Sequence, residues 1–216
     1  MRFGLICEGV TDFHVLKHVI KSYFSDAQIN DIQPELDARQ MGTAENEFGS
    51  WEQVAAYLKT DQFEVTVENS DYVVVQIDTD VCEHVNFGVS PISLANIDHD
   101  AFYEAIKQKL IAWMDSYEAG IYEHYKKKII FAISVHSLEC WLLAYHGSKG
   151  NKIVGCIDEL CTVINRKGGS FNTKNKDYRE YIDYSKDLKK KKNHKDIIAK
   201  SASFKKFVEQ LDVIPT

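Results

Sequence analysis

The chain has 216 residues, a hydrophobic fraction of 44% and an aromatic fraction of 12%, which support a packed core and exclude a disordered protein. No apolar run reaches the roughly 18 residues of a membrane span, and MRFGLICEG becomes charged too early for a secretory signal, so we expect a cytoplasmic protein without a membrane partner. The net charge of −6 is uneven: residues 1–120 hold 7 Lys and Arg against 21 Asp and Glu, and residues 121–216 hold 19 against 11.

The N-terminal fifty residues predict a strand, a helix and a loop. The apolar run at 3–7 predicts a buried strand, and apolar residues at helical spacing from Asp12 predict a helix that Thr11 could cap. Residues 26–50 contain proline, glycine and scattered polar residues, which predicts a loop with a short strand near 32–36.

Two further strands are predicted in the middle of the chain. The runs YVVVQI at 72–77 and IIFAIS at 129–134 are apolar and rich in β-branched residues, as expected of strands buried on both faces. Residues 61–70 fit either an edge strand or a helical extension. Helices are predicted at 51–58, at about 101–126 with a break near Gly120, and at 137–144.

The C-terminal third predicts helices and a basic surface. Helices are expected at 153–164 and near 202–211, and residues 189–192 form a lysine run. An acidic front and a basic back suit a protein that collects cations in one region and contacts a polyanion with another. The alternative is a lysine-rich surface that is simply well solvated.

The five cysteines include no C-x-x-C pair, so we expect neither a disulfide framework nor a zinc ribbon, and Cys140 is expected to be a core residue.

Carboxylates follow all three predicted buried strands. Glu8 comes after the first strand, Asp78 and Asp80 after the second, and Glu139 just beyond the third. Strands that alternate with helices indicate a mostly parallel sheet, whose carboxyl edge collects functional groups. Several acids at one edge need a cation, and oxygen ligands favour Mg²⁺ or Mn²⁺. Each acid alone could instead be a turn or helix cap, the role that we expect for Asp98.

The order of these motifs resembles the TOPRIM domain. LICEGVTD, VVVQIDTD and AISVHSLECWLLA are similar to its glutamate, D-x-D and S-x-E-x-W segments, and the closest likeness is to the stand-alone, OLD-type branch that includes the RloB-like proteins of bacterial defence. The resemblance implies an α/β fold with a Rossmann-like, mostly parallel sheet flanked by helices, in residues 1–147. Residues 148–216 are then a helical, lysine-rich extension packed on the same domain.

The resemblance also implies a metal-dependent nuclease that cleaves DNA or RNA with one or two Mg²⁺ or Mn²⁺ ions. Glu8 matches a metal ligand or general acid/base, and Asp78 and Asp80 match the D-x-D metal ligands. A lysine near the scissile phosphate is expected downstream, with Lys195 and Lys186 as candidates. The positions that match a second metal site are Asp12, Ser137 and Glu139. The lysines that would bind nucleic acid are Lys189, Lys190, Lys191 and Lys192.

Two other functions fit parts of the sequence. A haloacid-dehalogenase-like phosphohydrolase would use Asp78 as nucleophile and Asp80 as acid/base, although Cys82 departs from that pattern and Glu8 would have no role. A non-enzymatic partner or sensor subunit with a TOPRIM-like fold is the third reading. The chain has no G-x-x-x-x-G-K-[ST] loop, so ATP would have to be bound by a partner ATPase. The sequence also leaves homo-oligomer formation open.

Overall fold

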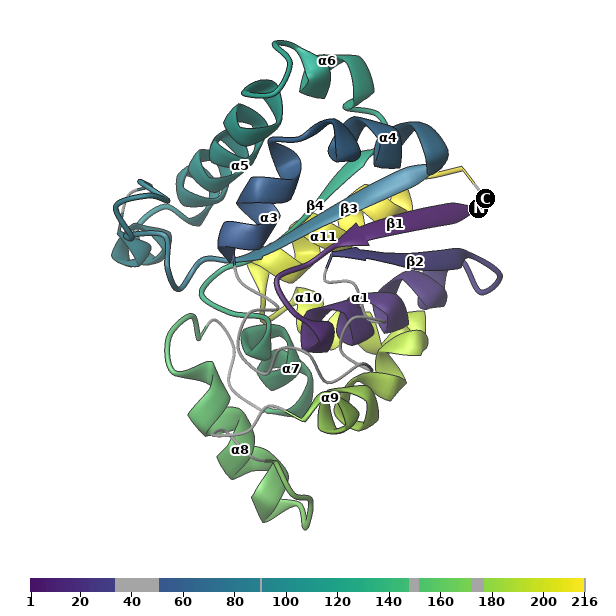
Figure 1. The fold of residues 1–216 in the computed structure, drawn as a ribbon. Helices are drawn as coiled ribbons and strands as arrows, with labels where there is room; N and C mark the ends of the chain where they lie inside the picture. Colours follow the sequence, from purple (N-terminus) through teal and green to yellow (C-terminus); the bar gives the residue numbers. More distant parts are fainter. Residues whose placement is uncertain (34–50, 90, 148–151, 172–176, 216) are drawn as a thin grey trace.

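The computed structural model describes residues 1–33, 51–89, 91–147, 152–171 and 177–215. Within these residues, four strands form one open sheet in the order β2-β1-β3-β4, and all neighbouring strands are parallel (Figure 1). The protein is therefore α/β, with a sheet compatible with a Rossmann-like fold. The strands are β1 (Arg2–Ile6), β2 (Gln28–Gln33), β3 (Tyr72–Asp78) and β4 (Ile129–Ser134).

Helices cover both faces of this sheet (Figure 1). The helices that connect β2 to β3 and β3 to β4 lie on one face, whereas α1 and the helices after β4 lie on the other (Figure 1). The α-helices are α1 (Val10–Tyr23), α3 (Trp51–Leu58), α4 (Asp61–Asn69), α5 (His99–Asp115), α6 (Ile121–Tyr125), α7 (Glu139–His146), α8 (Cys156–Arg166), α9 (Tyr178–Ser185), α10 (His194–Ile198) and α11 (Ala202–Asp212). Short 3-10 helices are η1 (Ile92–Asn96), η2 (Lys186–Lys189) and η3 (Lys191–Asn193).

The alternation of strand side chains divides the core in two. On β3, Val73, Val75 and Ile77 face the cluster beneath α3 to α6, and Val74 faces the cluster beneath α1, α7 and α11. Because both faces are covered, the strands are almost continuously apolar, as the sequence predicted. None of the described helices has the length and apolar character needed to cross a membrane.

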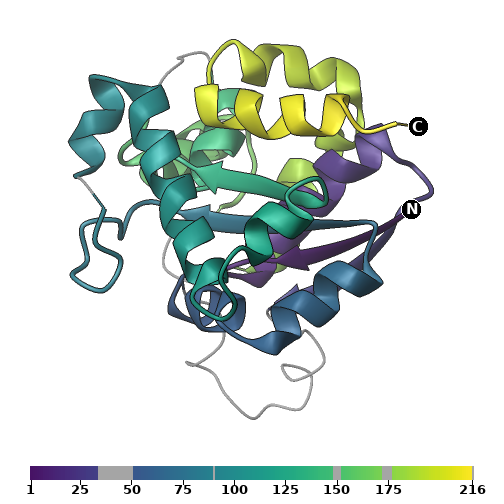
Figure 2. The same cartoon turned by 90° about the horizontal axis from the view of Figure 1, so that it is seen from above.

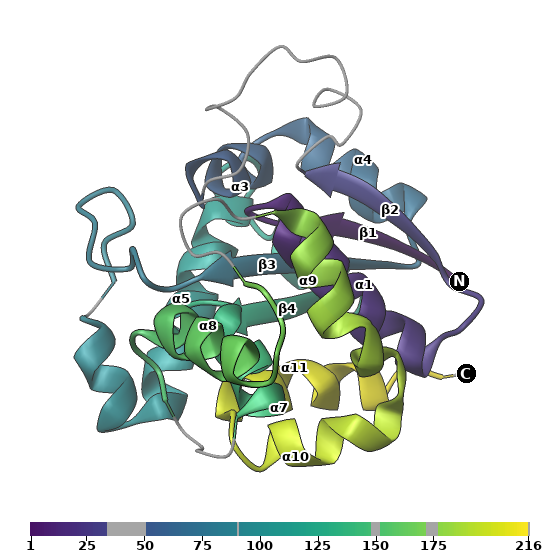
Figure 3. The same cartoon turned by 90° about the horizontal axis from the view of Figure 1, so that it is seen from below.

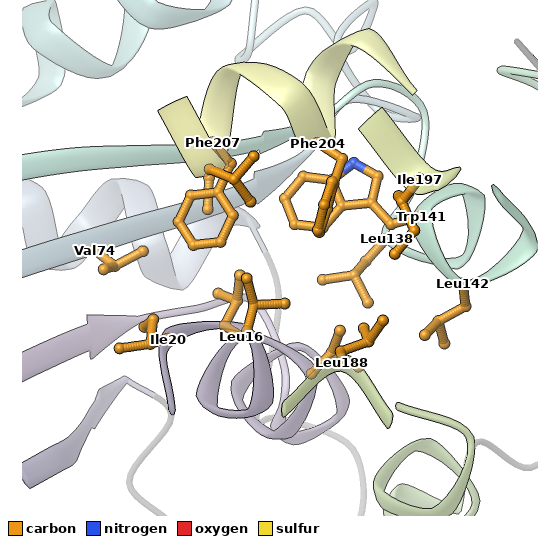
Figure 4. Packing of buried hydrophobic residues seen from close by; sticks show 14 of the residues in the cluster. Leu16, Ile20, Val74, Leu138, Trp141, Leu142, Leu188, Ile197, Phe204 and Phe207 are labelled. Carbon is orange, nitrogen blue, oxygen red and sulfur yellow. The ribbon is translucent and has the colours of Figure 1, made fainter. Parts of the chain in front are cut away.

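The second cluster joins the C-terminal helices to the rest of the protein. Trp141 of α7 is fully buried and stacks on Phe207 of α11 with ring centroids 5.6 Å apart, while Phe204 meets it edge-on at 5.3 Å. Leu16 and Ile20 of α1 complete this layer (Figure 4). The helices after residue 151 thus share an apolar core with α1 and β3 (Figure 4).

The outer edge of β4 is covered by α11, which runs beside it (Figure 2). The side chain of Gln210 accepts from the Phe131 backbone N–H and donates to the Phe131 carbonyl, both at 2.9 Å. This amide satisfies two backbone groups that a fifth strand would otherwise pair, so the edge is closed against another chain at this point.

The structure settles several local expectations. Residues 61–69 are helix α4, because Phe63 and Val67 are four apart and both fully buried. The short strand precedes its expected position: β2 ends at Gln33, and residues 34–36 lie outside the described residues. The predicted break near Gly120 is confirmed, since Gly120 has a φ of 87° and separates α5 from α6. The helix expected from residue 153 begins instead at Cys156, after Gly155.

A further difference concerns the cysteines. Cys140 and Cys156 form a disulfide that joins the start of α7 to the start of α8, with Cα atoms 5.0 Å apart. Cys140 is buried in the core as expected, but the expectation that the cysteines form no disulfide is wrong. The two cysteines are sixteen positions apart in the sequence, and the packing of α7 against α8 brings their Cα atoms within the range of a disulfide.

Candidate functional site

The acids predicted from the sequence lie where the sheet topology changes direction. From β1 the chain passes to β2 on one side, and β3 then returns to the other side of β1. Ligands of open α/β sheets bind outside the carboxyl ends of the strands at such a switch point. Glu8 follows β1 and Asp78 closes β3, so they stand on the two sides of this crevice.

Backbone and side-chain hydrogen bonds hold these two acids together. The Asp78 N–H donates to Glu8 Oε1 at 2.5 Å, and the Glu8 N–H donates to Gln76 Oε1 at 2.9 Å. Gln76 Nε2 in turn donates to Asp78 Oδ1 at 3.0 Å, as does the Leu138 N–H at 3.1 Å. The ends of β1, β3 and β4 are thus tied through polar groups, which makes this edge of the sheet a defined site.

Gln76 is a residue of this site that was not predicted from the sequence. It is fully buried, and it interrupts an otherwise apolar strand in the run YVVVQID. A buried amide must find hydrogen-bond partners, so a lone glutamine in such a run is the signal that could have found it. Its role is to orient Asp78 and the Glu8 backbone.

Two more predicted acids join from helices. Asp12 in the first turn of α1 has an exposed fraction of 7%, and Glu139 at the start of α7 has one of 2%. A Cβ atom on Gly9 would lie 2.9 Å from Asp12 Oδ2, so the glycine leaves space for this carboxylate. Gly9, and not Thr11, precedes the first residue of α1, and Thr11 lies within the helix. Glu8, Asp12, Asp78 and Glu139 are called the acidic cluster below.

The charges of these acids act on one another. The pKa of the Asp78 carboxyl is raised well above its ordinary value, first by desolvation and then by the charges of Asp12, Glu8, Glu139 and Asp80. Burial and the charges of Asp12, Glu8 and Asp78 likewise raise the pKa of the Cys7 thiol. Negative charges crowded in a desolvated place are stabilised by protons or by a cation.

Asp80 and Ser137 lie beside the cluster in less central positions. In a strand, side chains two positions apart point to the same face, but β3 ends at Asp78 and this rule does not apply to Asp80. Asp80 is exposed. The Asp80 N–H donates to the His136 carbonyl at 2.9 Å. Ser137 is 7% exposed and precedes Leu138, the N-cap of α7, and its carbonyl accepts from the Cys140 N–H.

The turn between β4 and α7 carries strain and unsatisfied polar atoms. His136 has a φ of 67°, which is rare for a residue with a side chain, and its N–H donates to Thr79 Oγ1 at 2.7 Å. Ser134 Oγ and His136 Nδ1 are buried and have no hydrogen-bond partner among the described residues. Ser134 is in register with Asp78. Strained residues and orphaned polar atoms of this kind cluster at functional sites.

The C-terminal region contributes one residue to the site that was not predicted from the sequence. Tyr181 of α9 donates its hydroxyl to Glu139 Oε1 at 2.6 Å, and its exposed fraction is 1%. Burial and the Glu139 charge raise the pKa of this phenol. In the sequence Tyr181 is one of several tyrosines in a polar segment, and nothing local distinguishes it from its neighbours.

The predicted lysines lie farther along α1. Lys191 stands over the ring of Tyr23, 3.9 Å from its centroid, and His194, the neighbour of Lys195, is 5.8 Å from the same ring. Tyr23 is eleven residues after Asp12, or about 16 Å along the helix axis. The structure therefore places Lys191 and Lys195 by the far end of α1 and does not bring them to the acids.

Lys186 lies closer, by the middle of α1. It follows Ser185, whose Oγ shares a hydrogen bond of 2.8 Å with His18 Nδ1. His18 is six residues after Asp12, or about 9 Å along the axis. Lys189, Lys190 and Lys192 are exposed on the same basic segment. Among the predicted lysines, this placement favours Lys186 over Lys195 for contact with a group bound at the acids.

The donor types of the cluster fit a hard divalent cation, since they are carboxylate oxygens with a hydroxyl nearby. In the described part of the chain, however, no three His, Cys, Asp or Glu side chains are grouped as a ready metal site. Some of these carboxylates accept hydrogen bonds from Tyr181 and from the backbone. No family model, curated protein or solved structure matches the chain.

Proposed function

We propose that this protein is a metal-dependent nuclease with a TOPRIM-type active centre that hydrolyses phosphodiester bonds in nucleic acid. The observation that carries the proposal is the acidic cluster: Glu8 and Asp78 are joined across the switch point of a parallel sheet, where desolvation and the charges of neighbouring acids raise the pKa of Asp78. A helix cap or a turn uses one carboxylate, whereas a cation site places several carboxylates near one another.

The cation would be Mg²⁺ or Mn²⁺, one or two ions. Glu8 and Asp78 would hold the first from the two sides of the switch point, with Asp80 at the rim. Asp12 and Glu139, with Ser137 beside them, would hold or position the second. Such ions, when bound, stabilise negative charge on the oxygens of a phosphodiester. The orphaned Ser134 Oγ supports a ligand at this place.

The chain's own groups would orient the reacting phosphate and move the proton. Glu8 is held by the Asp78 N–H and projects from the turn after β1, so we assign it proton transfer to and from water. Lys186 is the predicted lysine best placed to approach a phosphate at the cluster. The segment with Lys189 to Lys192 would bind the nucleic-acid backbone farther away, which makes binding weaken with salt.

The likeness to RloB-like proteins adds a biological setting to the proposal. We place the nuclease in bacterial antiviral defence, in the cytoplasm, and beside a partner ATPase, because the chain has no G-x-x-x-x-G-K-[ST] sequence of its own. Both DNA and RNA remain substrates to be tested.

The decisive experiment measures cleavage and metal binding together. Purified protein is incubated with plasmid DNA, single-stranded DNA and structured RNA in Mg²⁺, Mn²⁺ or EDTA, while calorimetry measures Mn²⁺ binding. We expect metal-dependent cleavage that Glu8→Gln and Asp78→Asn each reduce by at least about 100-fold. Asp98→Asn, an exposed helix cap outside the cluster, is the matched control and should cleave as wild type. Equal cleavage by all four proteins, or no Mn²⁺ binding by wild type, would refute the proposal.

A further inference from the structure

Helix α9 contacts both helices that carry acids of the cluster. Tyr181 reaches Glu139 of α7, while two other residues of α9 bind α1: Tyr178 stacks on His14 at 5.5 Å, and Ser185 shares a hydrogen bond with His18. Figure 3 shows α9 lying against α1 near the edge where the strands end. A short helix of the C-terminal region therefore spans the two helices on one side of the cluster.

The contact with Glu139 is made in a desolvated place. Both side chains are almost fully buried, and the 2.6 Å distance is typical of a hydroxyl that donates to a charged carboxylate. A buried carboxylate that loses such a donor cannot replace it easily with bulk water, so it rotates or recruits another partner. The Tyr181 hydroxyl thus restricts the orientation of the Glu139 carboxylate.

A second tyrosine of α9 uses its hydroxyl for different contacts. The hydroxyl of Tyr184, one turn later, accepts from the Ser170 N–H at 3.0 Å and donates to the Ser170 carbonyl at 2.7 Å. These two bonds stabilise the chain after α8 and do not involve the acids. The two tyrosines of one helix therefore differ in what their hydroxyls bind, and Tyr184 is also the less buried of the two. Tyr184→Phe removes a phenol hydroxyl from the same helix without touching the Glu139 bond.

We infer that Tyr181 is a positioning residue of the cation site, whose hydroxyl holds Glu139 in the orientation that a divalent cation meets. The inference rests on the proposed function, since it takes Glu139 as a ligand. It gives the C-terminal region a second task besides binding the nucleic-acid backbone: residues of α9 complete the surroundings of the acids. Outer-shell partners of this kind typically alter metal affinity by about 10- to 100-fold when they are removed.

The test compares Tyr181→Phe with Tyr184→Phe. Calorimetric titration with Mn²⁺ should show an affinity about tenfold weaker for Tyr181→Phe and within about twofold of wild type for Tyr184→Phe. The half-saturating Mn²⁺ concentration for cleavage should rise in parallel for Tyr181→Phe, while the rate at saturating Mn²⁺ changes less. Thermal unfolding in EDTA shows that each variant is folded, and the retained ring makes this the expected result.

A double variant distinguishes an effect on Glu139 from a general loss of structure at the site. In Glu139→Gln, which has no carboxylate to orient, adding Tyr181→Phe should leave the remaining Mn²⁺ affinity unchanged. A tenfold loss in both backgrounds, or wild-type affinity in Tyr181→Phe, would overturn the positioning role while leaving the nuclease proposal intact. Weaker Mn²⁺ binding by Tyr181→Phe in a protein that cleaves no nucleic acid would support the positioning role and refute the nuclease. A wild-type protein that does not bind Mn²⁺ would overturn both.

Discussion

Replacing Asp78 with asparagine removes one negative charge from the most crowded point of the acidic cluster. The change keeps the shape of the side chain, and the amide oxygen of the new side chain can still accept from Gln76 Nε2 and from the Leu138 N–H. Because the charge is repelled by four neighbouring acids and is desolvated, its loss should stabilise the metal-free protein at pH 7. The same change should weaken Mn²⁺ binding.

The size of the effect follows from two opposing contributions. Two hydrogen bonds to Oδ1 change from charged to neutral acceptors, which costs about 1 kcal/mol each. Against this, two like charges at a generic separation of about 8 Å and an effective dielectric constant of about 20 repel by about 2 kcal/mol, and more than one acid acts on Asp78. We expect a net gain of about 1–2 kcal/mol, or about 2–8 °C in the unfolding temperature of a domain this long.

The pH dependence has a definite sign. A raised folded-state pKa means that the folded protein binds the Asp78 proton more tightly than the unfolded chain does. Proton binding therefore stabilises the wild-type fold at low pH, and this stabilisation is lost as the pH rises through the folded-state pKa. Asp78→Asn has no proton to lose at this position, so its stability does not fall for this reason. The difference in unfolding temperature between Asp78→Asn and wild type should therefore be near zero below about pH 4 and grow above it.

Differential scanning calorimetry in EDTA from about pH 4 to about pH 8 checks this prediction, with Asp98→Asn as a control that should stay within about 1 °C of wild type. Saturating Mn²⁺ should raise the unfolding temperature of wild type and reverse the order of the two proteins. An Asp78→Asn protein that unfolds below wild type at pH 7 in EDTA would refute the argument from charge crowding.

Three further predictions test other parts of the structure. Gly9→Ala should fold normally, because its φ of −146° suits any residue, but the new Cβ displaces the Asp12 carboxylate, so calorimetry should show Mn²⁺ affinity reduced several-fold. Trp141→Ala should lower the free energy of unfolding in urea by about 3–5 kcal/mol, since it empties a fully buried site. Reduction of the Cys140–Cys156 disulfide should cost about 2–4 kcal/mol, and an unfolding temperature unaffected by reductant would contradict that crosslink.

Several features of the candidate site could be read from the chain because they depend on neighbours in sequence. Burial on both faces produces continuous apolar runs, which located β1, β3 and β4, and acids placed directly after such runs must meet at one edge of a parallel sheet. Asp98 was likewise recognisable, and its side chain accepts from the Ala101 N–H as expected of a helix cap. The N-cap of α1 was predicted two positions too late, at Thr11, because the sequence does not distinguish Thr11 from Gly9, which also suits a helix start.

The amino-acid sequence by itself determined the alternation of strands and helices, the acids at the strand ends and the basic character of the last third. Only the tertiary structure decided what surrounds those acids. Gln76 bridges to a turn 68 residues earlier, Tyr181 reaches an acid 42 residues away, and Lys191 is carried to the far end of α1. The spacing of apolar residues predicts which face of a helix or strand is buried. Contacts between distant segments depend on how whole helices pack, and a local sequence pattern does not predict that packing.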